Sequence, residues 1–448
     1  MSRLRAVRGR MTASRRGVLS IAAGSAGGQV LALAAAPLLA RLYSPADFGV
    51  FTIVAALVTT IGTVAAFRFE LAVPLPERER DAQALVALGL AAAAATALLG
   101  TVAVLLVGDG VAGLFGRPEL RPWLWLVPPA AAATAAVLVL NQMAIRHRRY
   151  GSIGRRNFLQ SATMVTTQVV AGAGGLRSGG LSLGLGMGQV VGALVLLPGA
   201  RSADPEVRAG RRLRHLWESA VRYRRFPLLL APSGLLNILG LQLPILFIAY
   251  WYPASVAGYL GLTQRVIAMP AALVASAVAQ VYLAEISRAV RGDGEGARRI
   301  FVGASRKLTL VAGPAALAVV LGAPTVFAVV FGAPWRTSGA YTQALALYMA
   351  AQIIASPLSQ TLIVLERQGL QLAWDVGRVV LVTGAVVAAA RSGASALTAI
   401  WALGVSGAVA YGAAWLMSLR AVTVDSRRAR QAAAGPRPVP VRAAALND

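Results

Sequence analysis

The sequence predicts an all-α, polytopic membrane protein with about twelve transmembrane helices, and three observations support this. Apolar stretches of about 20 residues, enough to cross a hydrocarbon core of about 30 Å as a helix, follow one another from residue 18 to residue 419. The composition is 57% hydrophobic and 13% charged, with a mean hydropathy of +0.65. The charged residues fall almost entirely between the apolar stretches.

The twelve helices are expected at 18–40, 47–67, 82–107, 122–141, 157–175, 179–199, 226–250, 255–283, 307–331, 341–365, 371–390 and 394–419. A basic tail, 1–17, precedes the first helix, as it would precede a signal peptide. The apolar stretch that follows is 23 residues long, which exceeds the apolar region of a cleaved signal. We therefore expect the first helix to be retained.

Positive charge alternates between successive connecting segments. One alternate set, which includes both termini, carries 35 of the 43 Lys and Arg residues if Lys307, the first residue of the ninth predicted span, is counted with it, and the other set carries 6. The remaining two, Arg265 and Arg378, lie inside predicted spans. Positively charged segments remain on the cytoplasmic side of a membrane. Both termini are therefore expected in the cytoplasm, with an even number of spans.

The basic segments outside the spans explain the net charge of +26, so nucleic acid is not an expected partner. Segment 200–225 is predicted to be a cytoplasmic, amphipathic linker that lies on anionic lipid. Segment 420–448 is rich in Arg, Ala and Pro, and we expect it to be a disordered cytoplasmic tail. The chain has no cysteine, which excludes disulfides and thiol chemistry.

A short internal repeat divides the chain into two halves. Tyr43–Gly49 (YSPADFG) enters the second span and Tyr252–Gly258 (YPASVAG) enters the eighth. The repeat predicts an N-terminal lobe, 18–199, and a C-terminal lobe, 226–419, with six helices each around a central cavity. An even number of spans per half makes the lobes parallel repeats, a layout in which a transporter carries its substrate between the halves.

Several segments resemble the polysaccharide transporter family, which comprises the oligosaccharide flippases of the multidrug/oligosaccharidyl-lipid/polysaccharide exporter superfamily. They are Arg41–Phe51 (RLYSPADFGVF) with Phe67–Pro76 (FRFELAVPLP), Gly258–Pro270 (GYLGLTQRVIAMP) with Gln280–Tyr282, and Leu365–Gln368 with Trp374–Arg378. The resemblance covers roughly residues 18–420.

The resemblance implies a function in the bacterial cytoplasmic membrane. A polyprenyl-diphosphate-linked oligosaccharide would pass from the cytoplasmic to the periplasmic leaflet, for the synthesis of O-antigen, capsule or exopolysaccharide. The glycan polymerase and the glycosyltransferases of the same pathway would be partners. Alternating access between the lobes is the expected mechanism. No enzyme activity, cofactor or metal is expected.

Arg265 is the leading candidate for the substrate pathway, because it lies near the middle of the eighth span and no acidic residue is near it in sequence. A charge within the membrane costs at least about 2.5–3.5 kcal/mol and usually faces an internal cavity. A guanidinium supplies planar donors suited to a diphosphate or an acidic sugar. The alternative is a structural arginine that binds backbone carbonyls. Arg378 is expected to be structural, either in a local ion pair with Asp375, one turn earlier, or with its charged end extended toward the membrane surface.

Amide side chains in the spans could bind sugar hydroxyls, although amides also join helices to one another. Those assigned to the pathway are Gln29, Asn237, Gln264 and Gln280. Arg68 and Glu70, at the end of the second span, are candidates for a cytoplasmic gate that pairs with the other lobe. Because they are two residues apart, their side chains would diverge on a helix.

Three other functions remain as alternatives. A cation-coupled drug exporter of the same superfamily would need buried carboxylates, and Asp375 is the acidic residue nearest to the interior of a span. A lipid II flippase of the superfamily would differ in its cargo. A membrane-bound glycan polymerase or glycosyltransferase would need catalytic acids, bases or a metal site, which the short outer segments do not offer.

Overall fold

The computed structural model describes residues 2–200, 213–291 and 296–434, and within them all side chains except those of 2–19, 268–277, 280, 291 and 428–434. Twelve helices of 20 or more residues account for most of this part of the chain. They are α1 (Ser2–Leu42), α2 (Pro45–Val64), α3 (Glu79–Leu114), α5 (Val127–Arg146), α6 (Tyr150–Ala173), α7 (Arg177–Ala200), α10 (Ala231–Trp251), α11 (Ala254–Arg291), α12 (Ala297–Phe331), α13 (Arg336–Leu358), α15 (Gln368–Arg391) and α16 (Ala396–Ala434).

The shorter elements lie in the connections. They are α4 (Arg121–Leu124), α9 (Leu213–Arg222), α14 (Gln360–Val364), the 3₁₀ helices η1 (Phe69–Ala72), η2 (Pro118–Leu120) and η4 (Ala333–Trp335), and the π-turn η3 (Phe226–Leu230).

Each predicted span corresponds to one of the twelve long helices, so the all-α prediction is confirmed. Ten of the described helices, counting η3 with α10 and α14 with α13, are long and apolar enough to cross a membrane. Several helices extend beyond their predicted ends. Because α16 continues to Ala434, the expectation of disorder is wrong for residues 420–434. Residues 435–448, at the end of the predicted tail, lie outside the described part.

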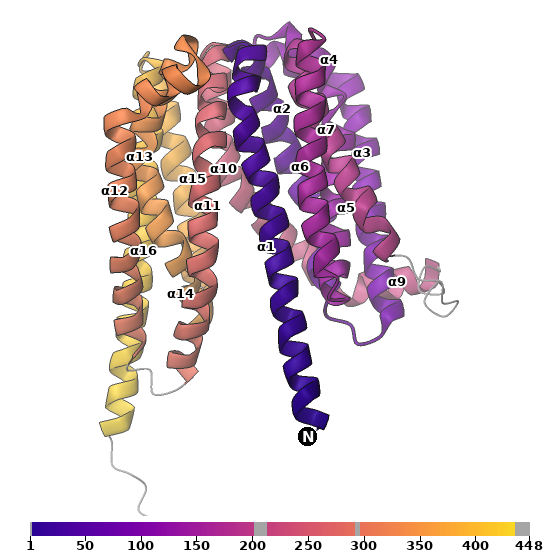
Figure 1. Ribbon diagram of the computed structural model, residues 1–448, viewed down its shortest axis with the longest axis vertical. Coiled ribbons are helices and arrows are strands. Elements are labelled where there is room, and N and C mark those ends of the chain that lie inside the picture. The colour runs from indigo at the N-terminus through magenta and orange to yellow at the C-terminus, as the bar shows by residue number, and fades with distance from the viewer. Residues whose placement is uncertain (1, 201–212, 292–295, 435–448) are drawn as a thin grey trace, which may run out of the picture.

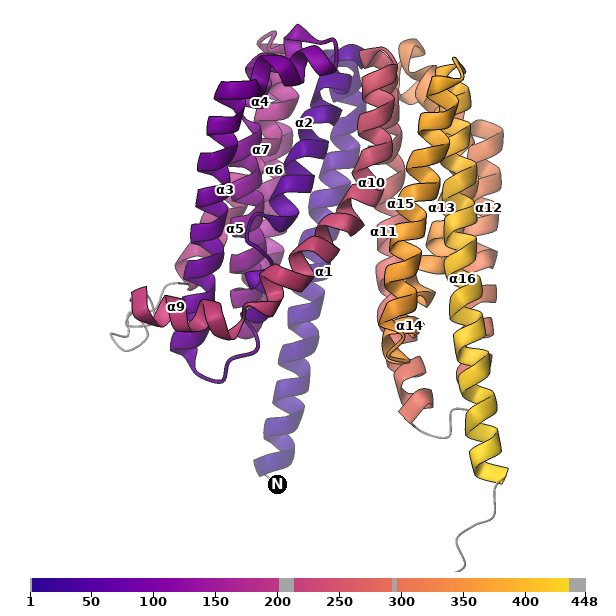
Figure 2. The same ribbon diagram turned by 180° about the vertical axis from the view of Figure 1, so that it is seen from behind.

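The helices form two groups, which we call the N-lobe (α1–α7) and the C-lobe (α10–α16) (Figures 1 and 2). The lobes come together at one end, which holds the connections at residues 43–44, 115–126, 252–253 and 332–335; this is the contact end. Toward the N-terminus of the chain the lobes diverge, and that side is the splayed end. In Figure 2, α10 runs diagonally from the contact end of the C-lobe toward α9 beneath the N-lobe.

Local sequence fixes the turn between α1 and α2 at the contact end. Ser44 accepts a hydrogen bond from the Asp47 backbone, and the Asp47 carboxylate accepts one from the Ser44 backbone. This capping box starts α2 at Pro45, where the missing N–H costs nothing. Asp47 also accepts a hydrogen bond of 2.9 Å from the backbone of Ser178 in α7. The turn that begins the first repeat is therefore tied to its own lobe.

The segment between the lobes contains α9, which packs against α3. His215 lies 2.9 Å from Asp81, and Ser219 is buried on the same side of the helix. Leu213 and Trp217 point outward and are exposed. Residues 201–212, in the first half of the predicted linker, lie outside the described part.

Candidate functional site

At the contact end, α2 and α11 pack backbone against backbone. A methyl group at Gly49 would overlap the carbonyl oxygen of Ala254, and one at Gly258 would overlap the carbonyl oxygen of Pro45. The two glycines are the last residues of the two sequence repeats, so the contact is nearly symmetric. Because only residues without a side chain allow this approach, no room remains between α2 and α11 at this end.

Two side chains, one from each lobe, donate hydrogen bonds to the opposite lobe beside this contact. Arg117, in the N-lobe, donates to the carbonyls of Ala249 and Tyr252 at the end of α10, at 2.9 and 2.6 Å. Trp335, in the C-lobe, donates its indole N–H to the carbonyl of Ala40 near the end of α1, at 2.9 Å. Each donor satisfies a carbonyl at or near the C-terminal end of a helix. We call these two interactions the latch pair.

The latch pair follows the internal repeat. Ala40 and Ala249 each lie three residues before the tyrosine that opens a repeat. The donors lie in or directly after a second short repeat, Phe-Gly-x-Pro, at Phe115–Pro118 and Phe331–Pro334. Arg117 is the third residue of the first copy, and Trp335 directly follows the second. Gly116 and Gly332 both have positive φ, as a sharp turn after a helix requires. Arg117 and Trp335 are not among the residues predicted from the sequence, although this second repeat could have indicated them.

Arg265 also bridges the lobes. It is half-buried, lies on α11 of the C-lobe, and donates a hydrogen bond of 3.2 Å to Oε1 of Gln168 on α6 of the N-lobe. Gln168 is fully buried and is held by its own donation to the carbonyl of Leu181 at 3.0 Å. Among the described residues, Arg265 has no carboxylate partner within ion-pair distance. Its charge is therefore met only by a neutral amide.

Arg378 has a different environment, inside the C-lobe. It is 5% exposed, lies 3.6 Å from the carboxylate of Asp375, and stacks 4.8 Å from the centre of the Trp374 ring. It donates to the Asn237 carbonyl at 3.3 Å and to the Tyr411 hydroxyl at 3.4 Å. The expected ion pair with Asp375 is confirmed, so the charge of Arg378 is balanced.

Arg378 also lines a cavity of about 230 Å³ between α10, α11, α13, α15 and α16. Polar side chains from three of these helices reach it: Gln242 from α10, Gln264 from α11 and Gln352 from α13. Tyr348, Met349 and Ile267 supply apolar surface. The cavity combines hydrogen-bonding groups with apolar walls, as small-molecule sites do.

At the splayed end, Arg68 and Glu70 form an ion pair of 3.4 Å, so the expectation that they diverge is wrong. The α-helix ends at Val64, and Arg68 has a left-handed backbone (φ 61°), which turns its side chain back toward Glu70. Glu70 is buried, and burial raises the pKa of its carboxyl while Arg68 opposes that rise. The guanidinium of Arg68 lies against Gly234 of α10, where a methyl group would overlap it. The pair therefore touches the opposite lobe through Arg68.

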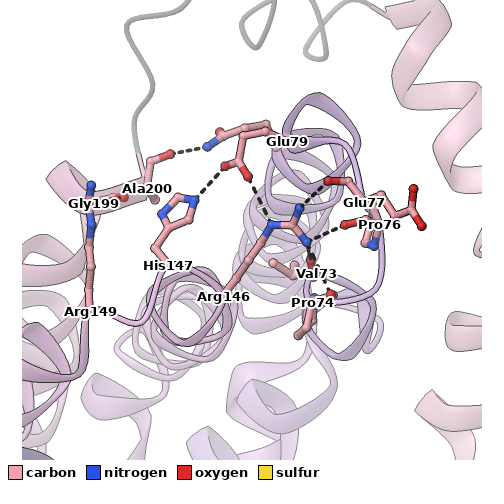
Figure 3. A network of polar contacts seen from close by, with 11 residues as sticks. Val73, Pro74, Pro76, Glu77, Glu79, Arg146, His147, Arg149, Gly199 and Ala200 are labelled. Atoms are coloured by element: carbon pink, nitrogen blue, oxygen red, sulfur yellow. Dashed lines mark hydrogen bonds and ion pairs between the residues drawn. The ribbon is translucent and has the colours of Figure 1, made fainter. Parts of the chain in front are cut away.

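A network centred on Arg146 holds the irregular loop 73–78, which directly follows the 3₁₀ helix η1 that contains Glu70 (Figure 3). Arg146 binds the Glu79 carboxylate at 3.2 Å and donates to the carbonyls of Pro76, at 2.6 Å, and Glu77, at 3.2 Å. His147 lies 2.8 Å from the other Glu79 oxygen. Since five N–H donors of one guanidinium can satisfy several carbonyls, Arg146 fixes a loop that has no regular structure of its own.

The predicted pathway amides do not gather in one place. Gln264 lines the C-lobe cavity, whereas Asn237 donates to Asp375 at 3.2 Å and supports the ion pair beside that cavity. Gln29 is half-buried on α1, and its side-chain oxygen has no hydrogen-bond partner among the described residues. The side chain of Gln280 lies outside the described part. The structure thus brings Gln264 and Asn237 close to Arg378, a residue that the sequence had assigned a structural role.

Comparisons with known proteins give one family and one fold. The model of a family described as polysaccharide biosynthesis protein matches residues 38–340. No curated protein matches the sequence significantly. The chain is similar in structure to the lipid II flippase MurJ in an inward closed conformation, with 10% identity, a TM-score of 0.71, and coverage of 92% of this chain and 90% of that one.

Two further solved structures are similar. One is an inward-facing multidrug resistance MATE family transporter of the MOP superfamily, with 13% identity, a TM-score of 0.62, and coverage of 91% of this chain and 95% of that one. The other is a MOP superfamily transporter from Pyrococcus furiosus, with 13% identity, a TM-score of 0.61, and coverage of 92% and 96%. At these identities the likeness shows the fold alone.

Proposed function

This chain belongs to the polysaccharide biosynthesis protein family, and from that premise we propose that it is a flippase for a polyprenyl-diphosphate-linked oligosaccharide. The cargo moves from the cytoplasmic to the periplasmic leaflet of the bacterial inner membrane. The glycan serves O-antigen, capsule or exopolysaccharide synthesis. The family match supports the pathway, and the fold, which is that of flippases and exporters, supports the transport step.

The proposal that the cargo carries a diphosphate rests on the environment of Arg265. Its guanidinium lies at the boundary of the two lobes and is hydrogen-bonded to a neutral amide, with no carboxylate partner among the described residues. A cation in this state is costly within a membrane and favours an anionic ligand. A diphosphate offers oxygens that a guanidinium can bind in a bidentate manner. Arg265 is therefore the proposed binding group for the diphosphate.

The arrangement of the lobes supports alternating access. The glycine contact and the latch pair close the contact end, while the lobes diverge at the splayed end. The positive connecting segments put the splayed end in the cytoplasm, so this state receives cargo from the inner leaflet. Arg68, which lies against α10, and Glu70 form the proposed gate at the cytoplasmic side. Release requires the contact end to open and the splayed end to close.

The state of Asp375 favours a flippase over a cation-coupled exporter. This carboxylate faces Arg378 at 3.6 Å and accepts hydrogen bonds from Asn237 and Gln371. A carboxylate that is already paired with a guanidinium is a poor site for sodium or a proton. A lipid II flippase remains the second candidate, because lipid II also carries a diphosphate.

Reconstituted proteoliposomes separate these functions. Fluorescent forms of a polyprenyl-diphosphate oligosaccharide, of lipid II, and of a cationic dye are each followed with a membrane-impermeant quencher. We expect the protein to accelerate exchange of the oligosaccharide lipid between leaflets more than that of lipid II, and not to move the dye. Preferential movement of lipid II or accumulation of the dye would overturn the proposal.

A further inference from the structure

The cavity in the C-lobe has several hydrogen-bonding groups that have no partner among the described residues. Gln242 and Gln264 line it, and neither makes a side-chain hydrogen bond to another described residue. Gln352 donates one hydrogen bond to the Tyr411 hydroxyl, at 3.2 Å. Arg378 is 5% exposed, and its Nε–H, which is buried, has no partner among the described residues. A buried donor without a partner is costly, and the three half-buried amides open onto the same cavity, so this set can bind a polar ligand.

The charge of the cavity selects a neutral ligand. Arg378 is balanced by Asp375, and both are oriented by Asn237 from the neighbouring helix. A diphosphate would bring charge that no further cation lining the cavity offsets. The free amides supply both N–H donors and carbonyl acceptors, which match the hydroxyl groups of a sugar, because each hydroxyl can donate and accept.

The size and walls of the cavity limit what fits. Its volume, about 230 Å³, is smaller than that of sites for drug-sized ligands, about 300–1,000 Å³, so it accommodates a single ring rather than a whole glycan. The ring of Tyr348 lines one side and is held by Tyr411, whose ring centre is 5.7 Å away. An aromatic face beside hydrogen-bonding groups suits a pyranose, which has apolar C–H faces and a polar rim.

We infer that this cavity is a subsite for one neutral pyranose unit, bound by Gln242, Gln264 and Gln352 against Tyr348. The inference rests on the proposed function, because it takes the sugar to be part of the cargo glycan. Gln264 directly precedes Arg265 on α11, and successive residues of a helix point about 100° apart. One turn of α11 therefore presents an arginine to the N-lobe and an amide to the cavity.

Binding of simple sugars to the full-length protein in lipid nanodiscs tests the subsite. The probes are the methyl glycosides of glucose, galactose and N-acetylglucosamine, with inorganic diphosphate as an anionic competitor, measured by saturation-transfer NMR. The test variant is Gln242→Leu with Gln264→Leu, which removes two amides that make no side-chain hydrogen bond to another described residue. Gln368→Leu, at an exposed amide in the same lobe, is the matched control.

We expect saturable binding of at least one glycoside, at least a tenfold loss of affinity in the double variant, and no change in the control. Thermal unfolding of the double variant should match that of the wild type. Absence of glycoside binding, equal binding by the double variant, or displacement of the glycoside by diphosphate at equal concentration would each overturn the subsite.

Transport of the polyprenyl-diphosphate oligosaccharide by the same preparations separates this inference from the proposed function. If the wild type binds no glycoside yet transports, the subsite is wrong and the flippase function stands. If the wild type binds a glycoside through the amides but transports no lipid-linked oligosaccharide, the proposed function is wrong and the subsite stands.

Discussion

The two arginines within the predicted spans show how the surroundings of a residue decide its role. Arg378 has a carboxylate at 3.6 Å and an indole ring at 4.8 Å, so its charge is satisfied inside one lobe. Arg265 has a neutral amide from the opposite lobe as its hydrogen-bond partner. The same side chain is thus structural at one site and available for an anion at the other. Removing each arginine should have different consequences.

Arg265→Ala should reduce transport at least tenfold while the protein remains at normal abundance in the membrane. Transport falls because the variant loses the cation proposed to bind the diphosphate. Abundance is kept because the variant loses only one hydrogen bond within the protein, the one to Gln168. Arg265→Lys should recover part of the activity, because an ammonium keeps the charge but lacks the planar fork. The measurement is exchange of the oligosaccharide lipid in proteoliposomes.

Arg391→Ala, at an exposed arginine that ends α15, is the control and should transport normally. An Arg265→Ala protein that is abundant and fully active would show that the arginine is not in the path. An Arg265→Ala protein that is missing from the membrane would show that the arginine is structural.

Asp375→Asn should destabilise the protein by about 3 kcal/mol, because it leaves the buried charge of Arg378 without a counter-ion. Transport by the wild type should persist without a sodium gradient, since the carboxylate is already paired. Thermal unfolding in detergent and transport with and without sodium measure the two effects. A rate that depends on sodium in the wild type and loses that dependence in a stably folded Asp375→Asn variant would contradict this prediction.

The helix ends at the contact end show the internal symmetry most clearly. Gly49 packs against Ala254, and Gly258 packs against Pro45, the equivalent residue of the first repeat. The latch pair joins the ends of α1 and α10 to the opposite lobe. The indole of Trp335 also packs against Phe48, with ring centres 5.0 Å apart. The same elements that repeat in the sequence therefore close one end of the pathway.

Loss of the latch pair should favour opening of the contact end. Arg117→Ala removes a buried hydrogen-bonded cation, and Trp335→Phe removes one N–H donor. Since a hydrogen bond to a charged group is worth about 1.5–3 kcal/mol, Arg117→Ala should raise the open fraction roughly tenfold or more. The chain has no cysteine, so spin labels placed at Leu176→Cys and Ser392→Cys report the distance between the lobes there.

Arg121→Ala is the matched control, because Arg121 also lies at the contact end but pairs with Asp109 of its own lobe. It should leave the distance distribution unchanged. If Arg117→Ala and Trp335→Phe together give the wild-type distribution, the latch pair does not hold the contact end closed.

At the scale of the whole molecule, the twelve helices and the distribution of arginine define an orientation. The splayed end carries the N-terminus and the long basic connections, and the contact end carries short connections with few positive charges. From the positive-inside rule we propose that the splayed end is cytoplasmic, so that the state in this structure faces the cytoplasm.

Reporter fusions test this orientation. A reporter that is active only in the periplasm should work near the connecting segments with few positive charges and fail within the basic connecting segments. The expected active positions are Ser44, Gly116, Gly175, Pro253, Pro334 and Gly393, and the expected silent ones are Gly151, Gly210 and Gly294. A periplasmic signal at Gly210, with normal expression, would contradict the division into two six-helix lobes.

The sequence by itself determined the class of the protein, its helices and its family. Apolar length and the position of charge must fit a bilayer, so the twelve spans could be read along the chain. The resemblance to the polysaccharide transporters is confirmed by the family match. The ion pair of Arg378 with Asp375 was also predictable, since the two residues are one turn apart on one helix.

Only the tertiary structure decided which helices touch and which side chains meet. Apolar patterning does not determine which helices pack together in lipid, because lipid is as apolar as the helix surface. Small residues and hydrogen bonds between helices determine the packing. Three features depend on how helices far apart in sequence are rotated and packed. They are the hydrogen bond between Arg265 and Gln168, the latch pair, and the cluster of Gln242, Gln264 and Gln352 beside Arg378. The pairing of Arg68 with Glu70 depends on a left-handed backbone at a non-glycine residue, which the tertiary fold imposes.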